Sequence, residues 1–345
     1  MRDKRKKLIK IISEAAVIFI TVIILCFIFK DSYKDIAKQL GHTDMLIFAG
    51  IAVLGNMYYI IDAVVYKILF KRENYRLSFP RCILVSYMSI FFNVTTFGAG
   101  IKPGQVLYLS RKGIEPGKGL AITTVPYVYH KAVIVGYAII MLLSNLSFVR
   151  GNFGSAIGYI YIGAGLNMVL ITVIILLCTA EWFHRLVYRL LNFIFRKPKY
   201  QKIKEKIWDQ TAGLRVGTKE LVGNAKMWLP MIAINVVKMT CWYVIPIIAI
   251  YASDGNIGTV TITQAITVTA IMQLIMGVIP TAGGVGSLEV VFSLVFEAVF
   301  GKVMAGASMV LYRLTTYYIP FLISIALVAV AQKDGSRPPD AIEYY

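Results

Sequence analysis

The chain has 345 residues, of which 58% are hydrophobic and only 16% are charged, and this balance excludes a soluble domain of that size. Composition therefore predicts a polytopic membrane protein. A formal net charge of +18 would suit a nucleic-acid partner. The basic residues are spread over several loops rather than gathered on one soluble domain, so we expect anionic lipid headgroups as partner, and no nucleic acid.

Apolar runs predict the membrane-spanning helices. About 20 helical residues cross the roughly 30 Å of hydrocarbon in a bilayer. Six runs reach that length: 8–29, 45–66, 119–143, 156–180, 227–251 and 303–331. The first follows a basic leader, residues 1–7, but it is too long for a signal peptide and lacks a small-residue cleavage site, so it is predicted to stay as an anchor. The expected fold is one all-α integral membrane domain over residues 1–345.

Two further apolar segments are interrupted by glycine and proline: 83–109 by FGAGIKPGQ and 261–299 by PTAGGVGSLE. Backbone groups freed by such a break persist in a membrane only where they are buried in protein or line a wet cavity. The arm 83–97 would be about 22 Å long as a helix, too short to cross, which predicts a re-entrant hairpin. The first arm of 261–299 is long enough to span. Broken segments entering from opposite faces outline an inverted repeat around a transport site.

The distribution of lysine and arginine predicts the orientation. With both termini cytoplasmic, the basic residues concentrate in the inner segments, as the positive-inside rule requires. Those segments are the leader, 67–81, 102–118, the linker 181–226 and the tail 332–345. Within the linker, 199–226 has the pattern of an interfacial amphipathic helix, and a solvated linker is the alternative.

Charged residues inside apolar segments are the candidate site, because intramembrane charge is costly and usually functional. Arg313 has the donor geometry to bind a phosphate, or it forms an ion pair with Glu289 or Glu297 that locks helices together. Glu289 follows the second break within one turn, where it holds an amine or caps the new helix. Lys238 is too deep to reach the interface and is predicted to face the bundle interior.

Polar residues on other spans are weaker candidates. His130 and Lys131 lie midway along 119–143 and are consistent with a polar lining or with structural roles. For Asn93, Gln105 and Gln273, hydrogen bonding between helices is the simpler expectation.

Three motifs together resemble the transmembrane, flippase-like region of the lysylphosphatidylglycerol synthase family. They are GAGIKPGQVLYLSRKGIEPGKGLA at 98–121, IPTAGGVGSLEVVF at 279–292 and LYRLTTYYIP at 311–320. The first departs from the family pattern at Ile101 and Lys102. Members that make the lysyl-lipid carry a soluble synthase domain after this region, and none is expected here because the chain ends at Tyr345.

The resemblance and the intramembrane charges together define the expected site. The expected lipid-binding residues are Lys131, Lys238, Arg313, Glu289, Gln105, Gly283, Gly284 and Gly286. Arg111 and Lys112 form an expected basic loop. No catalytic residue, metal or cofactor is expected, since no catalytic or nucleotide-binding motif is present.

The expected function is movement or binding of an anionic or aminoacylated phospholipid of the lysylphosphatidylglycerol type, in a bacterial cytoplasmic membrane. One alternative is a phosphatidylglycerol lysyltransferase that uses lysyl-tRNA and confers resistance to cationic peptides. Another is a membrane partner of a separate lipid-modifying enzyme. ATP-driven transport by this chain alone is not expected.

Overall fold

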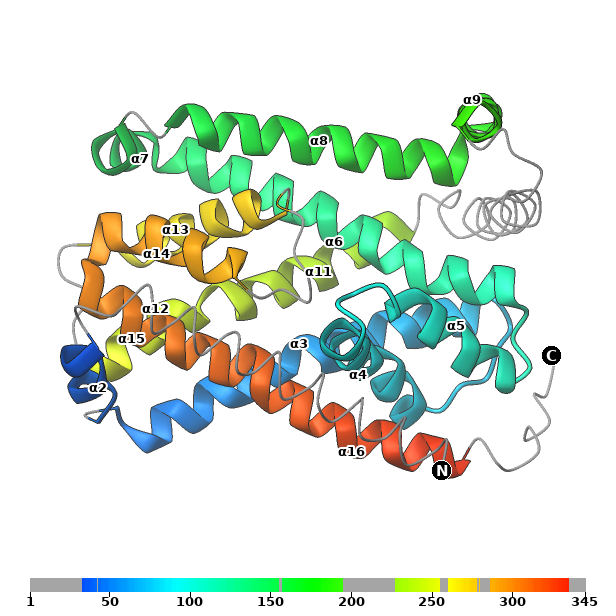
Figure 1. Cartoon of the computed structure of the whole chain (residues 1–345), viewed down its shortest axis with the longest axis horizontal. Coiled ribbons are helices and arrows are strands. Elements are labelled where there is room, and N and C mark those ends of the chain that lie inside the picture. The colour runs from blue at the N-terminus through cyan, green and yellow to red at the C-terminus, as the bar shows by residue number, and fades with distance from the viewer. Residues whose placement is uncertain are drawn as a thin grey trace.

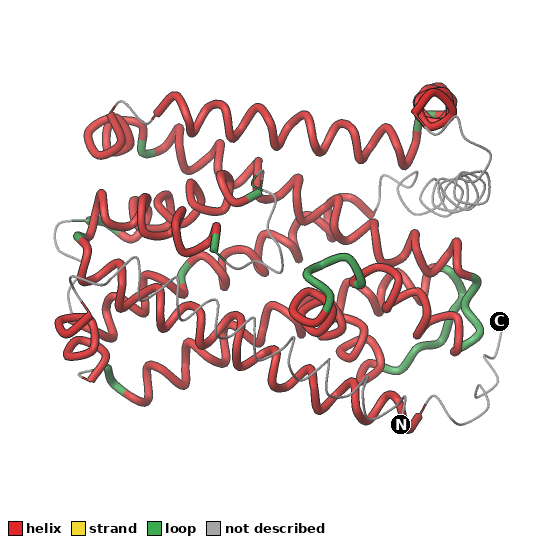
Figure 2. The backbone as a smooth tube through the Cα atoms, viewed as in Figure 1, coloured by secondary structure: helices red, strands yellow, loops and turns green. Residues whose placement is uncertain are grey.

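The structure is a computed structural model in which every described element is a helix (Figures 1 and 2). It describes residues 33–41, 43–154, 157–194, 227–254, 260–277, 279 and 286–334. The elements are α2 (Tyr33–Gly41), α3 (Met45–Arg72), α4 (Phe79–Thr95), α5 (Ile101–Arg111), α6 (Pro116–Ser144), α7 (Leu146–Phe153), α8 (Ile157–Thr179), α9 (Glu181–Ile194), α11 (Trp228–Tyr243), α12 (Ile245–Asp254), α13 (Ile262–Met276), α14 (Ser287–Phe300), α15 (Lys302–Arg313), the π-helical turn η4 (Leu314–Tyr318) and α16 (Ile319–Asp334).

Four helices in the described part of the chain are long and apolar enough to cross a membrane. They are Met45–Arg72, Pro116–Ser144, Trp228–Ala252 and Lys302–Val330. A fifth candidate joins α7 to Ile157–Leu170 across a bend of 120°. The four correspond to predicted spans 45–66, 119–143, 227–251 and 303–331, and α8 covers the predicted span 156–180.

Other predicted segments cannot be compared with the structure. The first run, 8–29, and the amphipathic segment 199–226 lie outside the described residues, as does all but the start of the tail 332–345. The count of six spans and the inverted repeat remain predictions.

The first predicted break is present, and α13 and α14 flank the second, of which residues 280–285 lie outside the described residues. Between α4 and α5 the chain turns through Phe97 (φ 52°) and Gly98 (φ 86°), and the Gly100 N–H donates to Thr96 Oγ1 at 2.7 Å. Helix α4 has 17 residues, about 25 Å, which agrees with a short arm. Before the second break, α13 has only 15 residues. At about 22 Å it is shorter than the sequence suggested for that arm.

The buried apolar residues form two clusters on either side of the bundle's middle. One joins α6, α7, α11 to α15 and single residues of α3 and α8, and the other joins α3, α4, α5, the first half of α6, α16 and single residues of α11 and η4. Helix α3 crosses between them. Each broken segment therefore packs mainly against a different half of the bundle.

Helix α3 and η4 approach so closely that a side chain at Gly55 has no room. A Cβ there would lie 2.3 Å from the Thr315 carbonyl oxygen, whereas a Cβ at Gly136 of α6 would meet no atom within 4 Å. We expect Gly55→Ala to destabilise the protein by about 1–3 kcal/mol through overpacking. Gly136→Ala should be neutral or slightly stabilising, because alanine favours helix. Thermal unfolding in detergent compares the two, and equal midpoints would contradict the close contact.

Candidate functional site

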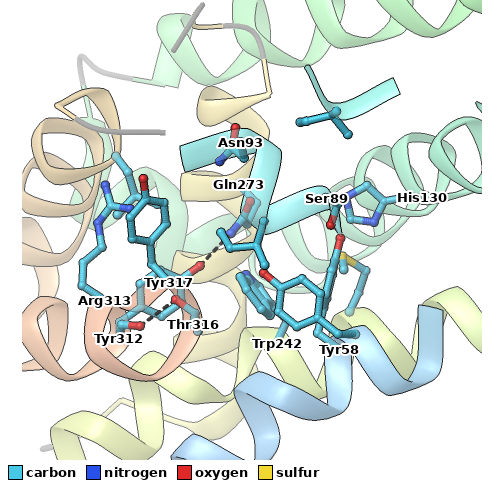
Figure 3. Close-up of a pocket in the computed structure, with 15 residues that line it drawn as sticks. Tyr58, Ser89, Asn93, His130, Trp242, Gln273, Tyr312, Arg313, Thr316 and Tyr317 are labelled. Carbon is cyan, nitrogen blue, oxygen red and sulfur yellow. Dashed lines mark hydrogen bonds between the residues drawn. The ribbon is translucent and has the colours of Figure 1, made fainter. Parts of the chain in front are cut away.

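A cavity of about 300 Å³ lies in the middle of the bundle (Figure 3). Its walls come from α3, α4, α5, α6, α11, α13, α14, α15 and η4. The lining residues are Tyr58, Tyr59, Ser89, Ile90, Asn93, Ile101, His130, Met239, Trp242, Gln273, Leu288, Tyr312, Arg313, Thr316 and Tyr317. Helices on both sides of both breaks contribute, so the two interrupted segments meet at one polar and aromatic cavity.

A buried ion pair joins Arg313 to Glu289 at one side of this cavity. Arg313 Nη2 lies 2.5 Å from Glu289 Oε1, and the two residues are 2% and 0% exposed. Glu289 Oε2 accepts a hydrogen bond of 2.7 Å from the Gly286 N–H, at the start of α14. Gly286 has φ 89°, which a residue with a side chain rarely adopts. Glu289 therefore serves as both ion-pair partner and helix cap.

Of the two acidic partners expected for Arg313, the structure selects Glu289. Glu297 instead accepts a hydrogen bond from Ser293 Oγ. Arg313 also lies over the ring of Tyr317, 4.9 Å from its centroid, and so borders the cavity beside a π-helical turn (Figure 3). Such turns are rare and occur frequently at functional sites.

A second buried ion pair lies on the α3 side. Lys238 Nζ is 2.8 Å from Asp62 Oδ1, and the Lys238 side chain is 1% exposed. The ammonium also lies 4.8 Å from the ring centroid of Tyr58, which lines the cavity. Asp62 was missed from the sequence, although an acidic residue inside the apolar run 45–66 is itself an indication of function.

Aromatic side chains complete the wall near this second pair. Tyr58 and Trp242 have ring centroids 4.6 Å apart, and Trp242 lies 5.9 Å from Tyr312. The Tyr312 hydroxyl accepts a hydrogen bond of 3.1 Å from Gln273 Nε2. His130 lies beside Tyr58, with ring centroids 6.0 Å apart, and its Nδ1 has no hydrogen-bond partner among the described residues (Figure 3). Four tyrosines, Tyr58, Tyr59, Tyr312 and Tyr317, thus line this interior cavity.

The remaining expected residues that the structure describes are not among those that line the cavity. Gln105 is buried and donates to the Val85 carbonyl at 2.9 Å, a contact between α5 and α4. Lys131 is half-buried and lies 5.6 Å from the Tyr127 ring centroid, on its own helix. Arg111 is exposed and Lys112 is buried at the end of α5. Gly283 and Gly284 fall outside the described residues. A lipid-binding role for any of these residues stays a prediction.

One protein family matches almost the whole chain. The sequence model of the Lysylphosphatidylglycerol synthase TM region matches residues 13–324. The chain belongs to this family. The match includes both broken segments, both ion pairs and every residue of the cavity wall, and it agrees with the resemblance carried by the three motifs. Together with its apolar helices, family membership makes the chain a multi-pass membrane protein. No curated protein matches the chain.

Proposed function

We propose that this chain is a flippase-like membrane protein that binds an anionic or aminoacylated phospholipid and carries its headgroup between leaflets. The observation that carries the proposal is the central cavity, which both broken segments wall and which two buried ion pairs border. Family membership supports a lipid-related role. A polar cavity inside an apolar bundle offers a headgroup the hydrogen bonds and opposite charges that the hydrocarbon lacks.

The ion pair beside the cavity suits a phosphate. A guanidinium has five N–H donors in a planar fork that matches the oxygens of a carboxylate or a phosphate. In the proposal, Arg313 exchanges its contact with Glu289 Oε1 for a phosphate oxygen, so that its charge stays compensated throughout. Such an exchange keeps the buried guanidinium paired, and the Glu289 carboxylate that it releases keeps its hydrogen bond from the Gly286 N–H.

The Glu289 carboxylate suits an amine. Glu289 Oε1 has only the ionic contact with Arg313 and receives no aligned hydrogen bond from the residues that the structure describes. Once Arg313 turns to a phosphate, this oxygen is available to the ammonium of an aminoacylated headgroup. A volume of about 300 Å³ lies at the small end of ligand pockets, which fits a headgroup whose acyl chains remain in the bilayer.

The test uses purified protein in unilamellar vesicles that contain a trace of fluorescent phosphatidylglycerol. A membrane-impermeant reductant destroys the label in the outer leaflet alone. We expect vesicles with protein to lose the protected inner-leaflet fluorescence as well, within the time in which protein-free vesicles keep it. A parallel assay follows lysyl-phosphatidylglycerol with an impermeant amine reagent. Rates equal to those of empty vesicles for both lipids would overturn the proposal.

A further inference from the structure

Helix α9 follows α8 almost without interruption but runs in a different direction. Helix α8 ends at Thr179 and α9 begins at Glu181. In Figure 1, α8 runs horizontally and α9 is seen end-on, so the axis of α9 is roughly perpendicular to that of α8. Its sequence, EWFHRLVYRLLNFI, places apolar residues three and four apart with polar residues between them, which is the pattern of an amphipathic helix.

The described side chains of α9 expose an apolar stripe beside a basic one. Trp182, Leu186 and Leu190 are 57%, 41% and 50% exposed and recur at every fourth residue. Arg185 and Arg189 are exposed as well and share that spacing, one position before the two leucines. An apolar stripe of this kind is unfavourable in water and marks a surface that is covered in the working protein.

The place of α9 in the bundle indicates what covers it. Figure 1 shows α9 at the same end of the molecule as α5 and the start of α6, the end where α3 also finishes. Helix α3 ends in Lys71 and Arg72, and Lys118 of α6 pairs with Glu73 at 3.5 Å. Because α3 and α6 are candidate spans, their ends define a membrane surface, and α9 lies across it at the end that the charge distribution predicts to be cytoplasmic.

We propose that α9 is an interfacial helix that binds the anionic phospholipid surface at this end of the protein. Its apolar stripe lies at the boundary between headgroups and acyl chains, and the two arginines reach outward to lipid phosphates. The occupant is lipid because a stripe of apolar side chains flanked by arginine complements an anionic interface, and because the preceding helix delivers α9 to that depth. This inference is independent of lipid movement through the cavity.

The experiment places the full chain, with Trp182 as its only tryptophan, in vesicles with or without phosphatidylglycerol. Trp208, Trp228 and Trp242 are replaced by phenylalanine. We expect phospholipids brominated near the headgroup end of the acyl chain to quench Trp182 emission, and acrylamide in the water to quench it weakly. The double variant Arg185→Glu/Arg189→Glu should reduce the bromine quenching at least twofold in vesicles with phosphatidylglycerol and leave it unchanged in zwitterionic ones.

A matched control uses the same charge reversal elsewhere. Arg150 is exposed in α7, at the other end of α8, and Arg150→Glu should leave the quenching of Trp182 unaltered. Strong acrylamide quenching without bromine quenching would overturn the inference in favour of a solvated helix. Protection from both quenchers would overturn it in favour of a protein partner, either a second copy or another segment of this chain. If bromolipids quench Trp182 equally in the double variant and in the chain that keeps both arginines, in vesicles with phosphatidylglycerol, the preference of α9 for anionic lipid is overturned.

Discussion

Arg313→Ala is expected to lower the rate of phosphatidylglycerol movement in vesicles by about tenfold to a hundredfold, which corresponds to the loss of one charge-assisted contact of roughly 1.5–3 kcal/mol. It should also destabilise the protein by about 3–5 kcal/mol, because it leaves the fully buried carboxylate of Glu289 without its cation. Thermal unfolding and the leaflet assay measure the two effects separately. Arg150→Ala, at an exposed position, should change neither.

Two further variants separate a ligand contact from a structural lock. Arg313→Lys keeps the charge but loses the planar fork, so it should recover stability better than transport. The double variant Arg313→Met/Glu289→Gln removes both charges and should restore most of the stability, because replacing a whole buried pair is often nearly neutral. Normal transport in this double variant would show that the pair only holds α14 against α15, and would remove both residues from the lipid path.

Asp62→Ala is expected to destabilise the protein by about 3–5 kcal/mol, since it leaves the buried Lys238 ammonium unpaired, and Lys238→Ala by less, since the Asp62 side chain is 13% exposed. A double-mutant cycle should give a coupling energy of about 0.5–3 kcal/mol between the two sites. The double replacement Asp62→Asn/Lys238→Met should therefore unfold at a higher temperature than either single alanine variant. The midpoint of thermal unfolding in detergent is the measurement.

The position of this pair beside Tyr58 adds a functional expectation. If the charges assist headgroup passage, the stable double variant should move phosphatidylglycerol more slowly than the unmodified chain does. Additive effects of the two alanine substitutions would contradict the ion pair. Coupled stability with unchanged transport would limit the pair to a structural role between α3 and α11.

The membrane-spanning helices were predictable because hydropathy is a property of each segment by itself. Helices α3, α6, α11 with α12, and α15 to α16 appear where apolar runs of the required length predict them. The break between α4 and α5 was predictable for the same local reason, since clustered glycine and proline interrupt a helix. The length of α13 was not, because the sequence does not mark the residue at which a helix before a glycine-rich turn ends.

The site was only partly predictable. Arg313 and Glu289 stood out as charges beside a break in apolar sequence, and Lys238 as a charge deep in a span. Asp62, an acidic residue inside the apolar run 45–66, carries a similar indication. For Gln105 the simpler expectation was a hydrogen bond between helices, and its amide donates to the Val85 carbonyl of α4.

The sequence by itself determined that the chain is a multi-pass membrane protein, where four of its long apolar helices lie, and to which family it belongs, because hydropathy and short motifs depend on neighbouring residues alone. Only the tertiary structure decided which charges pair. Asp62 and Lys238 are 176 residues apart along the chain, and no local pattern encodes their 2.8 Å contact. The same holds for the cavity, whose walls come from nine elements. Packing of helices distant in sequence brings these groups together, and the cost of an unpaired buried charge makes their pairing specific.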